Sequence, residues 1–151
     1  MMSAQNLKRI FWFFAVFSFL GFADATFLTV EHYLGTPIPC SILGGCDVVT
    51  NSLYSQIGPV PIALIGALYY LTLIILSIIY FDSKKEVYLK IGAYLSVSGF
   101  LVSLVLVYLQ VSVIHALCLY CMISALFSTI LFLLGQVMLY NLRHNKEQVS
   151  I

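Results

Sequence analysis

The four cysteines are the residues of this sequence best suited to chemistry, and they fall into two pairs. Cys40 and Cys46 are separated by five residues, whereas Cys118-Leu119-Tyr120-Cys121 is a C-x-x-C motif. A thiolate of one pair can attack the disulfide of another through a mixed-disulfide intermediate, so two neighbouring pairs can pass electrons along. The sequence therefore predicts a disulfide-exchange relay with Cys40, Cys46, Cys118 and Cys121 as its catalytic residues.

Other interpretations of the same cysteines remain open. Cys118 and Cys121 could be ordinary buried cysteines of a helix, and Cys40 and Cys46 could form a purely structural staple in a loop. The four sulfurs could also bind one zinc ion in tetrahedral geometry. The neighbouring segments offer little of the surrounding support that zinc sites use, so we expect no metal site.

The elements that must position the cysteines are membrane-spanning helices. The 151 residues are 62% hydrophobic and 9% charged. Four apolar runs, at about 10–30, 59–81, 88–110 and 118–140, are long enough to cross a bilayer, and such runs must be helical to satisfy their backbone in lipid. We predict an all-α integral membrane fold: one domain over 1–151 that forms a four-transmembrane-helix bundle.

The first run also resembles a cleavable export signal, because Lys8 and Arg9 precede it and Ala23-Asp24-Ala25 resembles a cleavage site. Its apolar character continues through Phe27, Leu28 and Val30, which gives a full spanning length. We therefore expect a retained helix.

The basic residues lie in three places: before the first run, around the connection between the second and third runs, and in the tail. They are Lys8, Arg9, Lys84, Lys85, Lys90, Arg143 and Lys146. Because basic residues concentrate on the cytoplasmic side, we expect a multi-pass protein of the cell (inner) membrane with both termini in the cytoplasm. All four cysteines then lie outside the cytoplasm, where disulfides persist.

The connection at 31–58 is the only one long enough for structure of its own. Val49, Leu53 and Ile57 recur at helical spacing, which predicts a short amphipathic helix over 47–57 that lies along the membrane surface. The net charge of +1 and the lack of a basic cluster argue against a nucleic-acid partner.

The order of these motifs resembles the vitamin K epoxide reductase (VKOR) family, particularly its bacterial and archaeal members. The shared features are C-x5-C, then Asp47-Val48-Val49 with Ser52, then Gly66 with Tyr69-Tyr70, and finally C-x-x-C at the head of the fourth run. The resemblance covers essentially the whole chain.

The resemblance implies a four-helix bundle around a membrane quinone, either ubiquinone or menaquinone, and a separate extracytoplasmic partner of thioredoxin fold. It implies that Cys40 exchanges with the partner, that Cys46 relays to Cys118, and that Cys121 faces the quinone. Ser52 matches the family's Ser/Thr position near the quinone headgroup.

The second run offers further quinone-binding candidates, because Ile62, Gly66 and Tyr70 share one helical face. Helix packing around Gly66 explains the same pattern. The animal enzymes carry Asn at the position of Ile62 and Tyr at the position of Ala125, so plain quinone reduction is favoured over epoxide reduction.

Alternatives to this function are a quinone-epoxide reductase, a DsbB-type oxidase, and a non-enzymatic membrane protein with structural disulfides. In DsbB-type oxidases the C-x-x-C pair comes first, so the order here is reversed. Two lone residues complete the candidates. Asp24 could be functional within the membrane or merely interfacial. His115 could tune a thiolate or could be a solvated loop residue.

Overall fold

The computed structural model describes residues 4–35 and 45–149, and four long helices account for most of them. These are α1 (Ala4–Leu34), α3 (Ile62–Ser83), α4 (Glu86–Leu109) and α5 (Leu119–Val149). Within the described residues they supply four candidate membrane spans: Lys8–Leu34, Ile62–Ser83, Glu86–Ile114 and Leu119–Arg143. The chain is thus a multi-pass membrane protein, and the predicted all-α fold class is confirmed.

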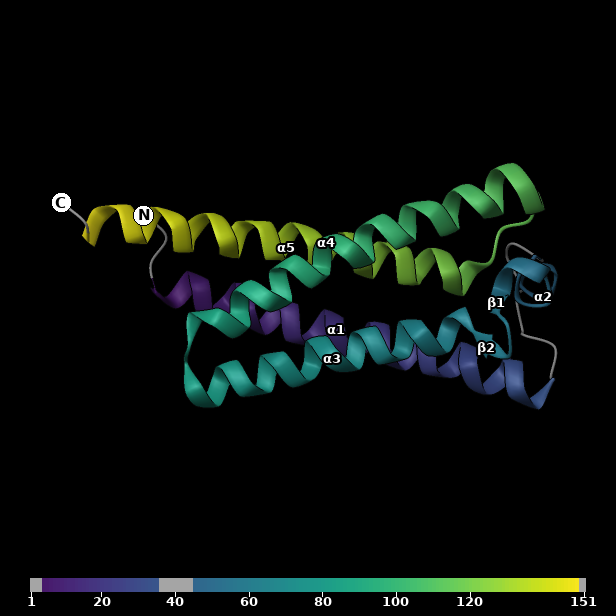
Figure 1. Cartoon of the computed structure of the whole chain (residues 1–151), viewed down its shortest axis with the longest axis horizontal. Helices are drawn as coiled ribbons and strands as arrows, with labels where there is room; N and C mark the ends of the chain where they lie inside the picture. Colours follow the sequence, from purple (N-terminus) through teal and green to yellow (C-terminus); the bar gives the residue numbers. More distant parts are fainter. Residues whose placement is uncertain (1–3, 36–44, 150–151) are drawn as a thin grey trace.

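The four helices run up and down along one long axis (Figure 1). Helix α1 packs against α3 and α5, and α4 packs against α3 and α5. The chain ends and the α3–α4 turn lie at one end of the bundle, while the short elements between α1 and α3 lie at the other end (Figure 1). Lys84 ends α3 in the left-handed conformation, and its N–H donates to the Tyr80 carbonyl at 2.8 Å.

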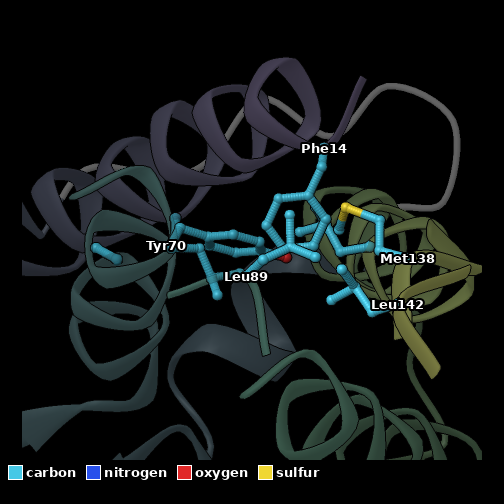
Figure 2. Close-up of a cluster of buried hydrophobic side chains, with 9 residues drawn as sticks. Phe14, Tyr70, Leu89, Met138 and Leu142 are labelled. Atoms are coloured by element: carbon cyan, nitrogen blue, oxygen red, sulfur yellow. The ribbon is translucent and has the colours of Figure 1, made fainter. Parts of the chain in front are cut away.

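The core is shared by all four helices. Phe14 of α1, Tyr70 of α3, Leu89 of α4, and Met138 and Leu142 of α5 point toward one another between the helices (Figure 2). Burial of large side chains from every helix favours one bundle over separate helix pairs.

Small polar residues share the interior with these large side chains, whereas many other large apolar side chains face outward. Ser18, Ser96 and Ser128 are fully buried, while Trp12, Phe19 and many aliphatic side chains are exposed. Ser18 and Ser96 donate to carbonyls of their own helices at 2.8 and 2.7 Å. Small interior residues and an apolar exterior are typical of helices that pack within lipid.

The segment between α1 and α3 contains the expected short helix, but this helix is shorter than predicted. Helix α2 covers Cys46–Thr50, a 3-10 turn covers Leu53–Ser55, and strands β1 (Gln56–Ile57) and β2 (Val60–Pro61) form a hairpin. The predicted helix over 47–57 is therefore wrong beyond Thr50.

Local hydrogen bonds explain this early end. The hydroxyl of Ser52 donates to the Val49 carbonyl at 2.7 Å, and that of Ser55 donates to the Ser52 carbonyl at 2.8 Å. Such bonds compete with helical ones. Val49 is buried while Leu53 and Ile57 are exposed, so the three do not form one buried face. Because β2 occupies Val60–Pro61, α3 begins at Ile62 rather than near 59.

Candidate redox site

Cys118 occupies the N-cap position of α5, immediately before its first helical residue, Leu119. The Cys118 carbonyl accepts a hydrogen bond from the Met122 N–H at 3.0 Å. Its sulfur accepts the Cys121 N–H at 3.4 Å, which is the side-chain bond that an N-cap residue makes. The C-x-x-C spacing therefore places the second cysteine where its backbone donates to the first.

Gln110 fixes Cys118 from the other side. The end of α4 widens into a π-helix over Gln110–Ile114, and His115 closes it in the left-handed conformation, with φ of 53°. The buried Gln110 side chain turns toward α5 and accepts the Cys118 N–H at 3.0 Å. One amide side chain thus satisfies a backbone donor that the helix start would leave unpaired.

Cys46 lies next to the Cys118–Cys121 pair. Cys46 and Cys118 are both fully buried and belong to one apolar cluster with Leu28 and Val49. Cys46 is disulfide-bonded, whereas Cys118 and Cys121 are free thiols. Cys40, the predicted partner-facing cysteine, lies outside the described residues.

Gly45 allows this close approach. A Cβ atom built on Gly45 would lie 2.7 Å from the Leu117 carbonyl oxygen and 2.8 Å from the Leu117 nitrogen. Only a residue without a side chain can bring the start of α2 this close to the backbone that leads into Cys118.

The environment favours the thiolate of Cys118, which precedes the fourth span. The hydrogen bond from the Cys121 side chain lowers the pKa of the Cys118 thiol, and the backbone N–H groups of Cys121 and Tyr120 act in the same direction. Burial and the nearby Asp24 oppose this effect on the pKa, but the net shift is downward. A thiolate is the nucleophile of disulfide exchange.

A cavity of about 360 Å³ opens beside Cys121. Helices α1, α3, α4 and α5 all contribute to its wall, and Val49, Ser52 and Tyr54 contribute from the segment between α1 and α3. Most of the wall is apolar, and a few polar side chains interrupt it. Apolar cavities with few polar groups are typical of small-molecule sites.

The cavity brings together every residue that the sequence assigned to quinone binding. They are Ser52, Ile62, Gly66, Tyr70 and Cys121. A Cβ atom on Gly66 would lie 3.8 Å from the Ala25 Cβ, so Gly66 also faces α1. Gly66 therefore both lines the cavity and packs against α1.

The deeper wall carries hydroxyl groups. The Tyr70 hydroxyl donates to the Ser124 carbonyl at 2.9 Å and lies 3.2 Å from the Ser124 Oγ. The hydroxyls of Tyr69 and Ser128 are buried on the same wall and have no hydrogen-bond partner within the described part of the chain. Unpartnered hydroxyls in an apolar cavity indicate a ligand with polar atoms.

Sequence reasoning missed Gln110, Ser124 and Ser128. Ser124 and Ser128 follow Cys121 at i+3 and i+7, so helical periodicity from the cysteine was the signal that could have found them. Gln110 was visible as the one amide in an apolar run. His115 has an exposed side chain, and its contribution is the backbone turn before Cys118.

Over residues 4–35 and 45–149, no group of three or more His, Cys, Asp or Glu side chains is arranged to hold a metal ion.

Comparison with known proteins agrees with this geometry. The model of the vitamin K epoxide reductase family matches residues 12–135, a range that runs from the start of α1 well into α5 and includes all four cysteines. The chain therefore belongs to the vitamin K epoxide reductase family, whose members are membrane oxidoreductases that use quinones. No curated protein sequence matches the chain.

Proposed function

We propose that this protein is a membrane thiol:quinone oxidoreductase that oxidises a separate thioredoxin-fold protein and reduces ubiquinone or menaquinone. In the cell this activity would support disulfide formation in exported proteins. The observation that carries the proposal is the position of the Cys118–Cys121 pair. One of its sulfurs is buried with Cys46, and the other lines the apolar cavity.

Electrons would enter through the first pair. A partner dithiol reduces the Cys40–Cys46 disulfide, with Cys40 as the sulfur that the partner attacks. The Cys46 thiolate then attacks Cys118 in a Cys118–Cys121 disulfide, and Cys40 resolves the mixed disulfide. This leaves the first pair oxidised and the second pair reduced. A disulfide at Cys46 and free thiols at Cys118 and Cys121 match that state.

The cavity suits a quinone headgroup. Its volume of about 360 Å³ lies within the usual range of small-molecule sites, and its wall combines apolar residues with the hydroxyls of Ser52, Tyr70 and Ser124. When bound there, a quinone would accept the two electrons of the Cys118–Cys121 dithiol. Cys121 is the one of these two sulfurs that lines the cavity.

We expect quinone itself, rather than a quinone epoxide, to be the substrate. Ile62 and Ala125 both line the cavity, at the positions where the resemblance places Asn and Tyr in the animal enzymes. Neither side chain can form a hydrogen bond with a ring oxygen.

The proposed orientation puts the cysteine end of the bundle outside the cytoplasm. The opposite end holds the start of α1 and the α3–α4 turn (Figure 1). Lys8 and Arg9 belong to the start of α1, and Lys84 and Lys85 form the turn. The distribution of basic residues along the chain supports this orientation.

Quinol formation by purified protein tests the redox role. With a dithiol donor and a short-chain ubiquinone or naphthoquinone, the wild type should form quinol, and Cys121→Ala should lose essentially all of that activity. Ser83→Ala, at the far end of α3, is a matched control that should retain it. Normal quinol formation by Cys121→Ala would refute the relay.

Trapping tests the partner. In Cys46→Ala the Cys40 thiolate can attack the disulfide of an oxidised exported thioredoxin-fold protein, and no Cys46 thiolate is present to displace that protein, so a mixed disulfide should accumulate in cells. The double variant Cys40→Ala/Cys46→Ala is the control and should give no adduct. If Cys46→Ala also gave none, Cys40 would not be the partner-facing residue.

A further inference from the structure

Asp24 is a carboxyl group inside the first membrane span, a place where ionisable side chains are costly and commonly functional. The Ser124 hydroxyl of α5 lies next to this carboxyl group. Its Oδ2 atom is buried and has no hydrogen-bond partner among the described residues. The titratable groups that face it from the neighbouring elements are Tyr70 of α3 and the Cys118–Cys121 pair.

Ser124 connects this carboxyl group to the cavity. It lines the cavity wall one helical turn after Cys121, and Asp24 lies next to it without lining the cavity itself. The Tyr70 hydroxyl gives its only proton to the Ser124 carbonyl, so its oxygen is free to accept one from the Ser124 hydroxyl at 3.2 Å. Tyr70 is almost fully buried, and its ring belongs to the apolar cluster of Figure 2.

The Ser124 hydroxyl has one proton and two acceptors within reach. When Asp24 is ionised, Ser124 donates to the carboxylate. When Asp24 is protonated, it donates to Ser124, and Ser124 can donate to Tyr70 or to a ligand in the cavity. The protonation state of Asp24 therefore decides whether Ser124 offers a proton toward the cavity.

We propose that Asp24 stores the proton that quinone reduction consumes and delivers it to the bound quinone through the Ser124 hydroxyl. This inference rests on the proposed function, because it assigns a role within the quinone half-reaction. The cysteine exchange steps themselves do not involve this carboxyl group.

The reactants are the Cys118 thiolate, the Cys121 thiol, protonated Asp24 and a quinone. The Cys121 S–H bond and the Asp24 O–H bond break, one S–S bond forms, and two electrons pass from the two sulfurs to the quinone. Its two oxygens gain one proton from Cys121 and one from Asp24, which gives the quinol, the Cys118–Cys121 disulfide and ionised Asp24.

Asp24 regains its proton when the first pair reduces the second. The Cys40 and Cys46 thiols lose two protons as their disulfide forms. One proton stays on Cys121, and the other is available to Asp24 because Cys118 remains a thiolate. Asp24 thus holds the proton that Cys118 lacks.

The test is a single-turnover measurement on the full-length protein in lipid nanodiscs. Protein with a reduced Cys118–Cys121 pair is mixed with a short-chain ubiquinone, and quinol formation is followed across a range of pH. The wild-type rate should fall on the alkaline side as Asp24 loses its proton. Asp24→Asn should slow quinol formation at low pH by about 100-fold, the usual scale of lost general acid catalysis, and abolish that alkaline limb.

Further variants separate proton delivery from packing. Asp24→Glu should restore the alkaline limb, and Ser124→Ala should lose it while keeping the backbone carbonyl that Tyr70 contacts. Asp82→Asn at the far end of α3 and Thr129→Ala on α5 remove comparable groups away from the cavity and should behave as wild type. Quinone affinity, measured by fluorescence quenching, should not change in Asp24→Asn.

The outcomes distinguish the two proposals. A wild type that never forms quinol would overturn both. An active wild type with an unchanged Asp24→Asn rate and pH profile would overturn the proton role alone. A slow Asp24→Asn that keeps the alkaline limb, or whose deficit comes only from weaker quinone binding, would also overturn it.

Discussion

Cys118 depends on short-range geometry for its reactivity. Cys118 is the N-cap residue of α5, and its sulfur accepts the Cys121 N–H. The Gln110 side chain accepts the backbone N–H of Cys118. The positive end of the helix dipole favours a negative charge at the same place. The helix start and the neighbouring thiol therefore act on one sulfur atom, while Gln110 holds the backbone of the same residue.

At the residue scale, this geometry predicts the titration of Cys118. Because the Cys121 side chain is the largest cause of the lowered pKa of Cys118, Cys121→Ala should shift the Cys118 titration to higher pH. In the reduced wild type, the first step of thiolate ultraviolet absorbance should occur below the pH at which an unperturbed cysteine titrates.

The control for this titration is the protein unfolded in denaturant, where the first step should return to the ordinary cysteine range. An identical first step in the folded and unfolded states would contradict a lowered pKa.

At the scale of elements, α2 and the start of α5 act as one unit because two backbones touch. Gly45 has no side chain, so the residue before Cys46 lies directly against Leu117, the residue before Cys118. The π-helix at the end of α4 contributes by placing Gln110 next to the same turn. Cys46 and the Cys118–Cys121 pair thus meet at the ends of three helices.

Gly45→Ala should therefore impair exchange between the pairs. The added Cβ meets backbone atoms that cannot yield, so α2 must move and Cys46 must shift away from Cys118. We expect electron transfer from the first pair to the second to slow by about tenfold or more, since small displacements strongly affect reacting groups. Rapid-quench alkylation of the four thiols measures this step.

Quinone reduction by a pre-reduced Cys118–Cys121 pair should remain normal in the same variant. Gly92→Ala is the matched control, because its Cβ would lie 3.9 Å from the Phe14 ring and fits without displacement. Equal exchange rates in Gly45→Ala and wild type would show that the close approach is not required.

At the scale of the whole molecule, basic residues and reactive cysteines lie at opposite ends of the bundle. Lys84 and Lys85 lie at the end opposite Cys46 and Cys118, because each long helix spans the length of the bundle (Figure 1). One end can then face the cytoplasm while the other meets exported proteins.

Reporter fusions test this orientation. A fluorescent protein fused after Ile151 should fluoresce, and an alkaline phosphatase fused at the same point should be inactive, because both report a cytoplasmic C-terminus. A phosphatase inserted within the 53–58 segment should be active. The opposite pattern would invert the proposed topology and place the cysteines in the cytoplasm.

The sequence by itself determined the four helices and the separation of cysteines from basic residues. Both follow from composition along the chain, since lipid requires long apolar helices and the cytoplasmic side collects basic residues. The C-x-x-C motif also placed Cys118 and Cys121 about one helical turn apart at the head of the fourth span, because a spacing of three residues within one helix fixes that separation.

Tertiary structure alone decided what surrounds those sulfurs. The burial of Cys46 with Cys118, the Gln110 bond to Cys118, and the place of Asp24 beside Ser124 join residues from different helices. The periodicity of apolar residues along one helix does not predict which helices become its neighbours or how each helix is rotated about its axis. The same reason explains the short α2: Val49, Leu53 and Ile57 had helical spacing, but local hydroxyl bonds and a hairpin ended the helix at Thr50.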